Sequence, residues 1–132
     1  MSRLLSISLL IVWTTAPADK APMPTARDVM KKLNGGPNSL HSTLGKDLKD
    51  EEPDWEAIQE ETAEYVKQTD VLRQSKPRKG DAGSWEALTK SYSADARALD
   101  AAAKKKDVRS TSAVLKRMSG SCMTCHKSHR PE

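Results

Sequence analysis

The sequence predicts an all-α protein, most simply an antiparallel four-helix bundle, and three observations support this prediction. Apolar residues recur at three- and four-residue steps over four stretches between residue 25 and the C-terminus. No stretch alternates apolar and polar residues with the period of two that a half-buried strand requires. The connections between the stretches are short, which favours antiparallel packing of neighbouring helices.

The chain has room for one domain with one hydrophobic core, because it has 132 residues. Only 36% of the residues are hydrophobic, 4% are aromatic and phenylalanine is absent, so we expect a thin core. The formal net charge is +4 among 30% charged residues. Such a mild excess differs from the concentrated basic surface of a nucleic-acid-binding protein, so we expect no nucleic-acid partner.

Residues 1–18 have the form of a secretory signal peptide. Arg3 supplies the positive start, residues 4–13 are an apolar run, and Ala16 and Ala18 offer small side chains around a cleavage point. A transmembrane anchor is the alternative, but a run of this length is about half of the roughly 20 residues that a spanning helix needs. We therefore expect an exported, periplasmic protein without a stable membrane anchor.

The remaining chain divides into a short leader and a folded domain. Residues 19–24 are expected to form an extended leader, because Pro22 and Pro24 disfavour helix. Residues 25–132 are expected to form the helical domain.

The first helix is predicted to begin at Thr25, which has the pattern of a capping box with Asp28. Helical spacing of apolar residues continues beyond the Gly-Gly-Pro sequence that ends at Pro37. We interpret residues 25–48 as one helix that is kinked or briefly broken at Pro37. Two separate short helices are the alternative.

Three further helices are predicted from apolar stripes and from their start signals. Pro53 suits the first turn of the second helix, next to acidic residues that favour the positive end of a helix dipole. Ser84 is the expected N-cap of the third helix and Asp107 that of the fourth. The stripe of the second helix is Trp55, Ile58, Thr62, Tyr65, Val66, Thr69 and Leu72, and that of the third is Trp85, Leu88, Tyr92, Ala96, Leu99 and Ala103.

The last helix carries a motif of two cysteines and a histidine. Cys122 and Cys125 enclose two residues and His126 follows at once, which is the pattern of covalent haem attachment. Positions i, i+3 and i+4 share one helix face, so both thiols can add to the haem vinyl groups while the imidazole reaches the iron. We predict one covalently bound haem c, with Cys122 and Cys125 as thioethers and His126 as the proximal iron ligand.

Three other interpretations of the motif are alternatives to haem attachment. A disulfide between Cys122 and Cys125 is one, and a thioredoxin-like redox pair is another, although the latter expects a strand before the motif and a helix beginning at it. A zinc site that adds His126 and His129 is the third. Four ligands on one helical stripe cannot surround a tetrahedral ion without other elements closing over it.

With a signal peptide, four helices and the attachment motif in the last of them, the chain resembles the class II c-type cytochromes, the cytochrome c-prime and cytochrome c-556 group. The resemblance covers the whole mature chain in architecture, and its highly specific residues are Cys122, Cys125 and His126. It implies a bundle with haem on the C-terminal helix and a sixth iron position that faces the first helix. Low-spin members place a methionine there and transfer electrons, whereas five-coordinate c-prime members bind nitric oxide or carbon monoxide.

The resemblance makes Met30 the candidate distal iron ligand, and Arg27 just before it a candidate contact of a haem propionate. An ordinary core methionine is the alternative for Met30. We expect His41 to be solvated rather than a ligand, and His129 to lie at the haem rim or in solvent.

Together these expectations favour a periplasmic monohaem carrier of one electron, not an enzyme, since no catalytic acid–base pair is visible. Redox partner proteins are expected to dock at the haem edge, where basic residues of the loops and the C-terminus could contact an acidic partner. The alternative is that these basic residues form only a solvated surface. A gas-binding c-prime-like protein is the alternative. A peroxidase would need a polar distal group, for which His41 is the candidate, and the sequence leaves a homodimer open.

Overall fold

The computed structural model of the chain describes residues 21–131, and these residues form five α-helices and no strand. The predicted all-α class is therefore confirmed. The predicted signal peptide, residues 1–18, and the first two residues of the predicted leader lie outside the described residues. No helix between residues 21 and 131 combines the length and the apolar character needed to cross a membrane.

Helix α1, Ala26–Asn34, begins with the predicted capping box. The Thr25 side chain accepts from the backbone N–H of Asp28 at 3.2 Å, and the Asp28 carboxylate accepts from the backbone N–H of Thr25 at 2.9 Å. Two of the amides that lack a partner at a helix start are thereby satisfied. These hydrogen bonds also hold the pKa of Asp28 below its usual value.

The chain breaks after α1 and begins a second helix, α2, Leu40–Asp47. The predicted break at Pro37 is confirmed, but it divides the segment into two helices, so the alternative of two separate short helices describes the structure. Gly36 has a φ of +93°, a backbone conformation that residues other than glycine rarely adopt and that lies outside the α-helical region, so the helix ends before it. Ser39 then caps the new helix by accepting from the backbone N–H of Ser42 at 3.4 Å.

Three long helices follow: α3, Trp55–Gln74, α4, Ala82–Lys104, and α5, Val108–His129. Each helix is preceded by an N-cap aspartate, whose carboxylate accepts a hydrogen bond from the backbone N–H three residues later. These aspartates are Asp54, Asp81 and Asp107. The predicted cap at Asp107 is confirmed.

Two predicted start positions are shifted. Ser84 lies inside the first turn of α4, because the carboxylate of Asp81 accepts its backbone N–H at 2.7 Å. Pro53 lies just before the N-cap Asp54 instead of in the first helical turn. Aspartate competes with serine and proline for these positions, and the local pattern does not decide between them.

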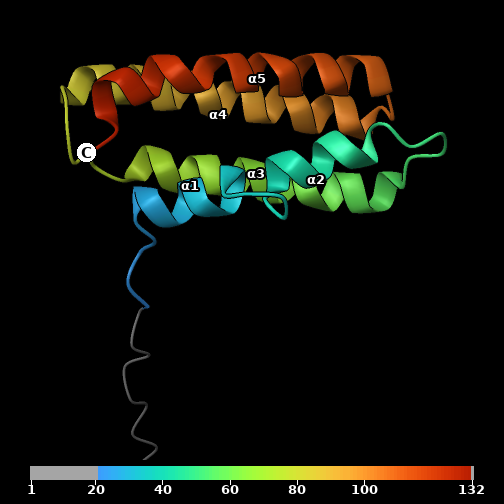
Figure 1. Cartoon of the computed structure of the whole chain (residues 1–132), viewed down its shortest axis with the longest axis horizontal. Helices are drawn as coiled ribbons and strands as arrows, with labels where there is room; N and C mark the ends of the chain where they lie inside the picture. Colours follow the sequence, from blue (N-terminus) through green and yellow to red (C-terminus); the bar gives the residue numbers. More distant parts are fainter. Residues whose placement is uncertain (1–20, 132) are drawn as a thin grey trace, which may run out of the picture.

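Helices α3, α4 and α5 run in alternating directions, and α1 and α2 follow one another beside α3 (Figure 1). The structure records packing between α3 and α4, between α4 and α5, and between α3 and both short helices, while α2 also contacts α5. The core contains both apolar and polar buried residues. Threonines contribute to it beside the aliphatic residues, and its fully buried members include Val29, Leu33, Leu44, Ile58, Thr62, Tyr65, Thr69, Leu99 and Met118.

Candidate functional site

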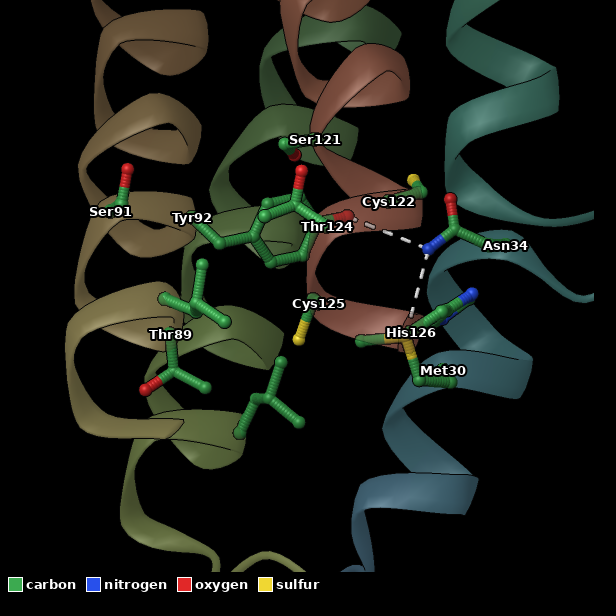
Figure 2. Close-up of a pocket in the computed structure, with 12 residues that line it drawn as sticks. Met30, Asn34, Thr89, Ser91, Tyr92, Ser121, Cys122, Thr124, Cys125 and His126 are labelled. Carbon is green, nitrogen blue, oxygen red and sulfur yellow. Dashed lines mark hydrogen bonds between the residues drawn. The ribbon is translucent and has the colours of Figure 1, made fainter. Parts of the chain in front are cut away.

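A hollow opens between α1, α4 and the last turns of α5, with one residue of α3 in its wall (Figure 2). It contains about 650 Å³ of space free of protein atoms, part of which is open to solvent. The enclosed cavity volume is about 150 Å³, which is below the range of about 300 to 1,000 Å³ of typical pockets for small molecules and cofactors, so the hollow is small. The lining residues are Met30, Asn34, Leu72, Leu88, Thr89, Ser91, Tyr92, Ser121, Cys122, Thr124, Cys125 and His126, and we call this hollow the Cys122 pocket.

The helical periodicity of α5 brings the predicted attachment residues to this pocket. Cys122, Cys125 and His126 are all half-buried and line it, as their i, i+3 and i+4 spacing requires. Met123, in the same motif, is 63% exposed. The three residues of the motif that carry chemistry therefore share one face and one cavity.

Both cysteines of the motif are free thiols. Burial raises the pKa of the Cys122 and Cys125 thiols above their usual value, and for Cys125 the neighbouring Cys122 adds to this effect. A redox-active or nucleophilic dithiol requires the opposite shift, toward the thiolate. The motif also lies inside a helix, and the described residues contain no strand before it, so the thioredoxin-like interpretation lacks its structural context.

Met30 reaches the pocket from α1 and is half-buried there (Figure 2). Asn34, one turn later, donates from Nδ2 toward the Met30 sulfur at 3.9 Å and toward the Tyr92 hydroxyl at 3.5 Å. The structure thus brings Met30 together with Cys122, Cys125 and His126. Arg27 is exposed and is not among the residues that line the pocket.

A chain of polar contacts runs from the pocket wall to the surface, and sequence reasoning missed it. The hydroxyls of Tyr92 and Tyr65 lie 2.7 Å apart, and the Tyr65 hydroxyl lies 3.2 Å from Nδ1 of His41. The other ring nitrogen of His41 lies 2.6 Å from Oγ of Ser119, which is exposed. We call Ser119, His41, Tyr65, Tyr92 and Asn34 the histidine relay.

Burial sets the acid–base character of this relay. It lowers the pKa of His41 and raises the pKa of both Tyr65 and Tyr92, so it favours the neutral form of each side chain. The expectation that His41 is solvated is therefore wrong. Tyr65 and Tyr92 could be found in the apolar stripes, but their pairing across two helices depends on the packing.

The second predicted peripheral histidine, His129, is also placed differently from the expectation. It is buried, at 5% exposure, and it packs edge-on against the Trp85 ring with 5.3 Å between centroids. Nδ1 lies 2.9 Å from the Lys79 carbonyl oxygen and Nε2 lies 3.1 Å from Oγ of Ser84. His129 thus fastens the end of α5 to the start of α4, and it does not line the Cys122 pocket.

The set of side chains at the pocket fits a haem better than a bare metal ion. Between residues 21 and 131 no group of three or more His, Cys, Asp or Glu side chains is gathered in a way that could hold a metal. The zinc interpretation is therefore not supported. A haem brings its own four nitrogen ligands, so it needs from the protein only an axial histidine, an optional second ligand and an apolar wall, and His126, Met30 and Leu88 are such residues.

Comparisons of the chain with protein families, with curated proteins and with solved structures gave no match.

Proposed function

We propose that this protein is an exported monohaem c-type cytochrome that carries one electron at a time between redox partner proteins. The observation that carries the proposal is the gathering of Cys122, Cys125, His126 and Met30 around one cavity, although Met30 lies far from the other three in the sequence. In this interpretation α1 and α2 together take the place of one broken helix in a four-helix bundle. The haem is attached to α5 in the manner of the class II cytochromes.

Each residue of the pocket has a role in this proposal. Cys122 and Cys125 are neutral, half-buried thiols on the face of α5 that borders the cavity, and they hold the cofactor covalently. His126 provides the proximal nitrogen and Met30 the distal sulfur. The haem iron supplies a centre that accepts and releases one electron while no substrate bond is made or broken.

The protein side of the pocket suits this task. Leu72 and Leu88 provide apolar surface, which lowers the local dielectric and limits the access of water. Asn34 orients the Met30 side chain by donating toward its sulfur. A methionine ligand raises the reduction potential relative to an open or bis-histidine iron. Export through residues 1–18 and docking of partners at the haem edge are parts of the same proposal.

The visible absorption spectrum of the purified protein tests the electron-carrier assignment. The protein is produced in a bacterium that attaches haem in its periplasm, and the spectrum is recorded in the oxidised and reduced states. We expect the weak band near the red end of the oxidised spectrum that marks iron–methionine ligation, and we expect Met30→Ala to lose it. Met118→Leu is the matched control, because Met118 is fully buried in the core and does not line the pocket.

A different spectrum would overturn the assignment. A high-spin oxidised spectrum in the unmodified protein, with a large shift on addition of carbon monoxide to the reduced form, indicates the five-coordinate, gas-binding alternative. A band that persists in Met30→Ala indicates another distal ligand.

A further inference from the structure

The histidine relay connects a titratable side chain to the wall of the Cys122 pocket through hydroxyl groups alone. It starts at Ser119 and His41 near the surface and passes through Tyr65 to Tyr92 and Asn34, which both line the pocket. A hydroxyl group can donate only one hydrogen. The direction of one hydrogen bond therefore fixes the direction of the next.

The contacts of Ser119 determine which nitrogen of neutral His41 carries its hydrogen. The Ser119 hydroxyl donates to the Leu115 carbonyl at 3.2 Å, so it accepts from His41 Nε2 at 2.6 Å. A neutral imidazole has one N–H, so Nδ1 is then an acceptor. Tyr65 donates to that nitrogen at 3.2 Å.

The rest of the relay follows in the same direction while His41 is neutral. Because the Tyr65 hydrogen is used on His41, the Tyr92 hydroxyl donates to the Tyr65 oxygen at 2.7 Å. Tyr92 in turn accepts from the Asn34 amide at 3.5 Å. Each hydroxyl hydrogen then points away from the pocket.

Protonation of His41 reverses this arrangement. Both ring nitrogens become donors, so the Tyr65 oxygen accepts from Nδ1 and its hydrogen turns to the Tyr92 oxygen. The Tyr92 oxygen then accepts from both Tyr65 and Asn34. Its own hydrogen has no acceptor left in the relay and is free to turn into the cavity that Tyr92 lines.

We propose that His41 is a positioning residue that controls the Cys122 pocket, and that its protonation turns the Tyr92 hydroxyl from Tyr65 toward the pocket as a hydrogen-bond donor. The groups that face His41 are Tyr65 from α3 and Ser119 from α5. Among the residues described, no charged side chain contributes to the shifted pKa of His41, which burial alone lowers. The titratable groups further along the relay are Tyr65 and Tyr92. Beside burial, Cys122 raises the pKa of both tyrosines and Cys125 raises that of Tyr92.

The consequence for the pocket, which rests on the proposed haem site, has a defined sign. A positive charge on His41 and a donor hydrogen on Tyr92 both favour the form of the cofactor that has gained an electron. The reduction potential is therefore higher when His41 is protonated. It falls as the pH rises through the titration of His41 and is constant above it.

Two measurements on the full chain, as purified, test the proposal. Nitrogen-15 NMR of labelled histidine between about pH 4 and pH 8 gives the tautomer and the titration of His41. Assignment comes from the signals that disappear in His41→Gln. In parallel, the reduction potential is measured over the same pH range for the unmodified protein and for His41→Gln, Tyr65→Phe and Ser93→Ala.

We expect neutral His41 to carry its hydrogen on Nε2 and the potential to fall through the same pH range in which His41 titrates. His41→Gln should lose this pH-dependent component, and Tyr65→Phe should reduce it to the part that the charge on His41 produces by itself. Tyr65→Phe keeps the ring and the histidine, so it remains informative if His41→Gln folds poorly. Ser93→Ala removes another interhelical hydrogen bond, the one to Asp70 at 2.8 Å, and should leave the component unchanged.

Neutral His41 with its hydrogen on Nδ1, or a pH-dependent component as large in Tyr65→Phe as in the unmodified protein, would overturn the proposal. A purified protein without haem would instead contradict the proposed function. The NMR measurement would still decide whether the relay has the stated direction.

Discussion

The long helices α3 to α5 and the short pair α1 and α2 differ in how they are held, and the proposed site lies between them. The three long helices have 20, 23 and 22 residues, whereas α1 and α2 have 9 and 8. Isolated helices shorter than about 12 to 15 residues are marginal in water, so α1 and α2 depend on their contacts with the long helices.

The division of functional residues follows this difference. The proposed attachment residues Cys122, Cys125 and His126 are on the long helix α5, while Met30 and His41 are on α1 and α2. In the proposed function the long helices therefore carry the residues that hold the cofactor, and the short pair carries those that adjust its properties. The following predictions test whether the two regions differ in stability.

Replacing a buried leucine in each region should give the largest effects on stability. Leu99 on α4 and Leu33 on α1 are both fully buried. Leu99→Ala should lower the free energy of unfolding by about 2 to 5 kcal/mol, because it leaves a cavity among the long helices. Leu33→Ala should act more locally, by loosening α1.

Urea unfolding and amide hydrogen exchange measure these two effects. We expect Leu33→Ala to speed exchange mainly in α1, while Leu99→Ala lowers protection throughout α3 to α5. Equal loss of protection in α3 to α5 for both variants would show that the short pair is not a separate, weaker unit.

Two glycines with positive φ provide a second, smaller contrast. Gly80 has a φ of +87°, and an added Cβ would meet the Ser128 carbonyl and, at 2.7 Å, Nδ1 of His129. Gly36 has a φ of +93°, with open space around an added Cβ. Gly36→Ala should cost about 1 kcal/mol from backbone strain, and Gly80→Ala at least about 3 kcal/mol, since the clash adds to the strain.

Thermal unfolding of both variants beside the unmodified protein checks this order. Equal losses for Gly36→Ala and Gly80→Ala would contradict the packing of the loop against the end of α5.

The smallest expected effect is a pH dependence at the contact of α2 with α3. Burial, aided by Asp47, raises the pKa of Glu61 to about 7 from 4.5, and within residues 21–131 its Oε2 atom is buried without a hydrogen-bond partner. The folded state therefore binds this proton more tightly than the unfolded chain does. The resulting stability is complete below pH 4.5 and is lost as the pH rises through about 7.

Glu61→Gln removes this titration. In the unmodified protein this titration lowers stability between pH 4.5 and pH 8, and Glu61→Gln should not show that loss. Urea midpoints measured at the two pH values give the difference for each protein. The exposed neighbour Glu60 supplies the control, Glu60→Gln, which should leave the difference between the two midpoints unchanged. A Glu61→Gln variant with the same difference as the unmodified protein would contradict burial of this carboxyl group.

The same contrast explains what the sequence could and could not predict. The helical class, the capping box at Thr25 and the cap at Asp107 follow from local patterns, and the structure confirms them. The break at Gly36 is ambiguous in the sequence, because the helical spacing of apolar residues continues across it while the helical conformation of the backbone does not.

His41 and His129 show more clearly what the sequence does not predict. The sequence predicts that His41 is solvated and that His129 lies at the haem rim or in solvent, but the partners of both side chains come from other helices. His41 meets Tyr65 and Ser119, and His129 meets Ser84. Long-range packing of this kind leaves no signal in one local stretch.

Covalent attachment of a haem by Cys122 and Cys125 underlies the proposed function, and a mass measurement of the denatured protein tests this attachment without intermediate steps. The protein is produced in a bacterium that attaches haem in its periplasm, beside the double variant Cys122→Ser, Cys125→Ser and the motif control Met123→Ala. We predict that the unmodified protein and Met123→Ala retain the mass of one haem after denaturation and that the double variant does not. An exported, helical, unmodified protein without that added mass would show that the two cysteines do not hold a haem.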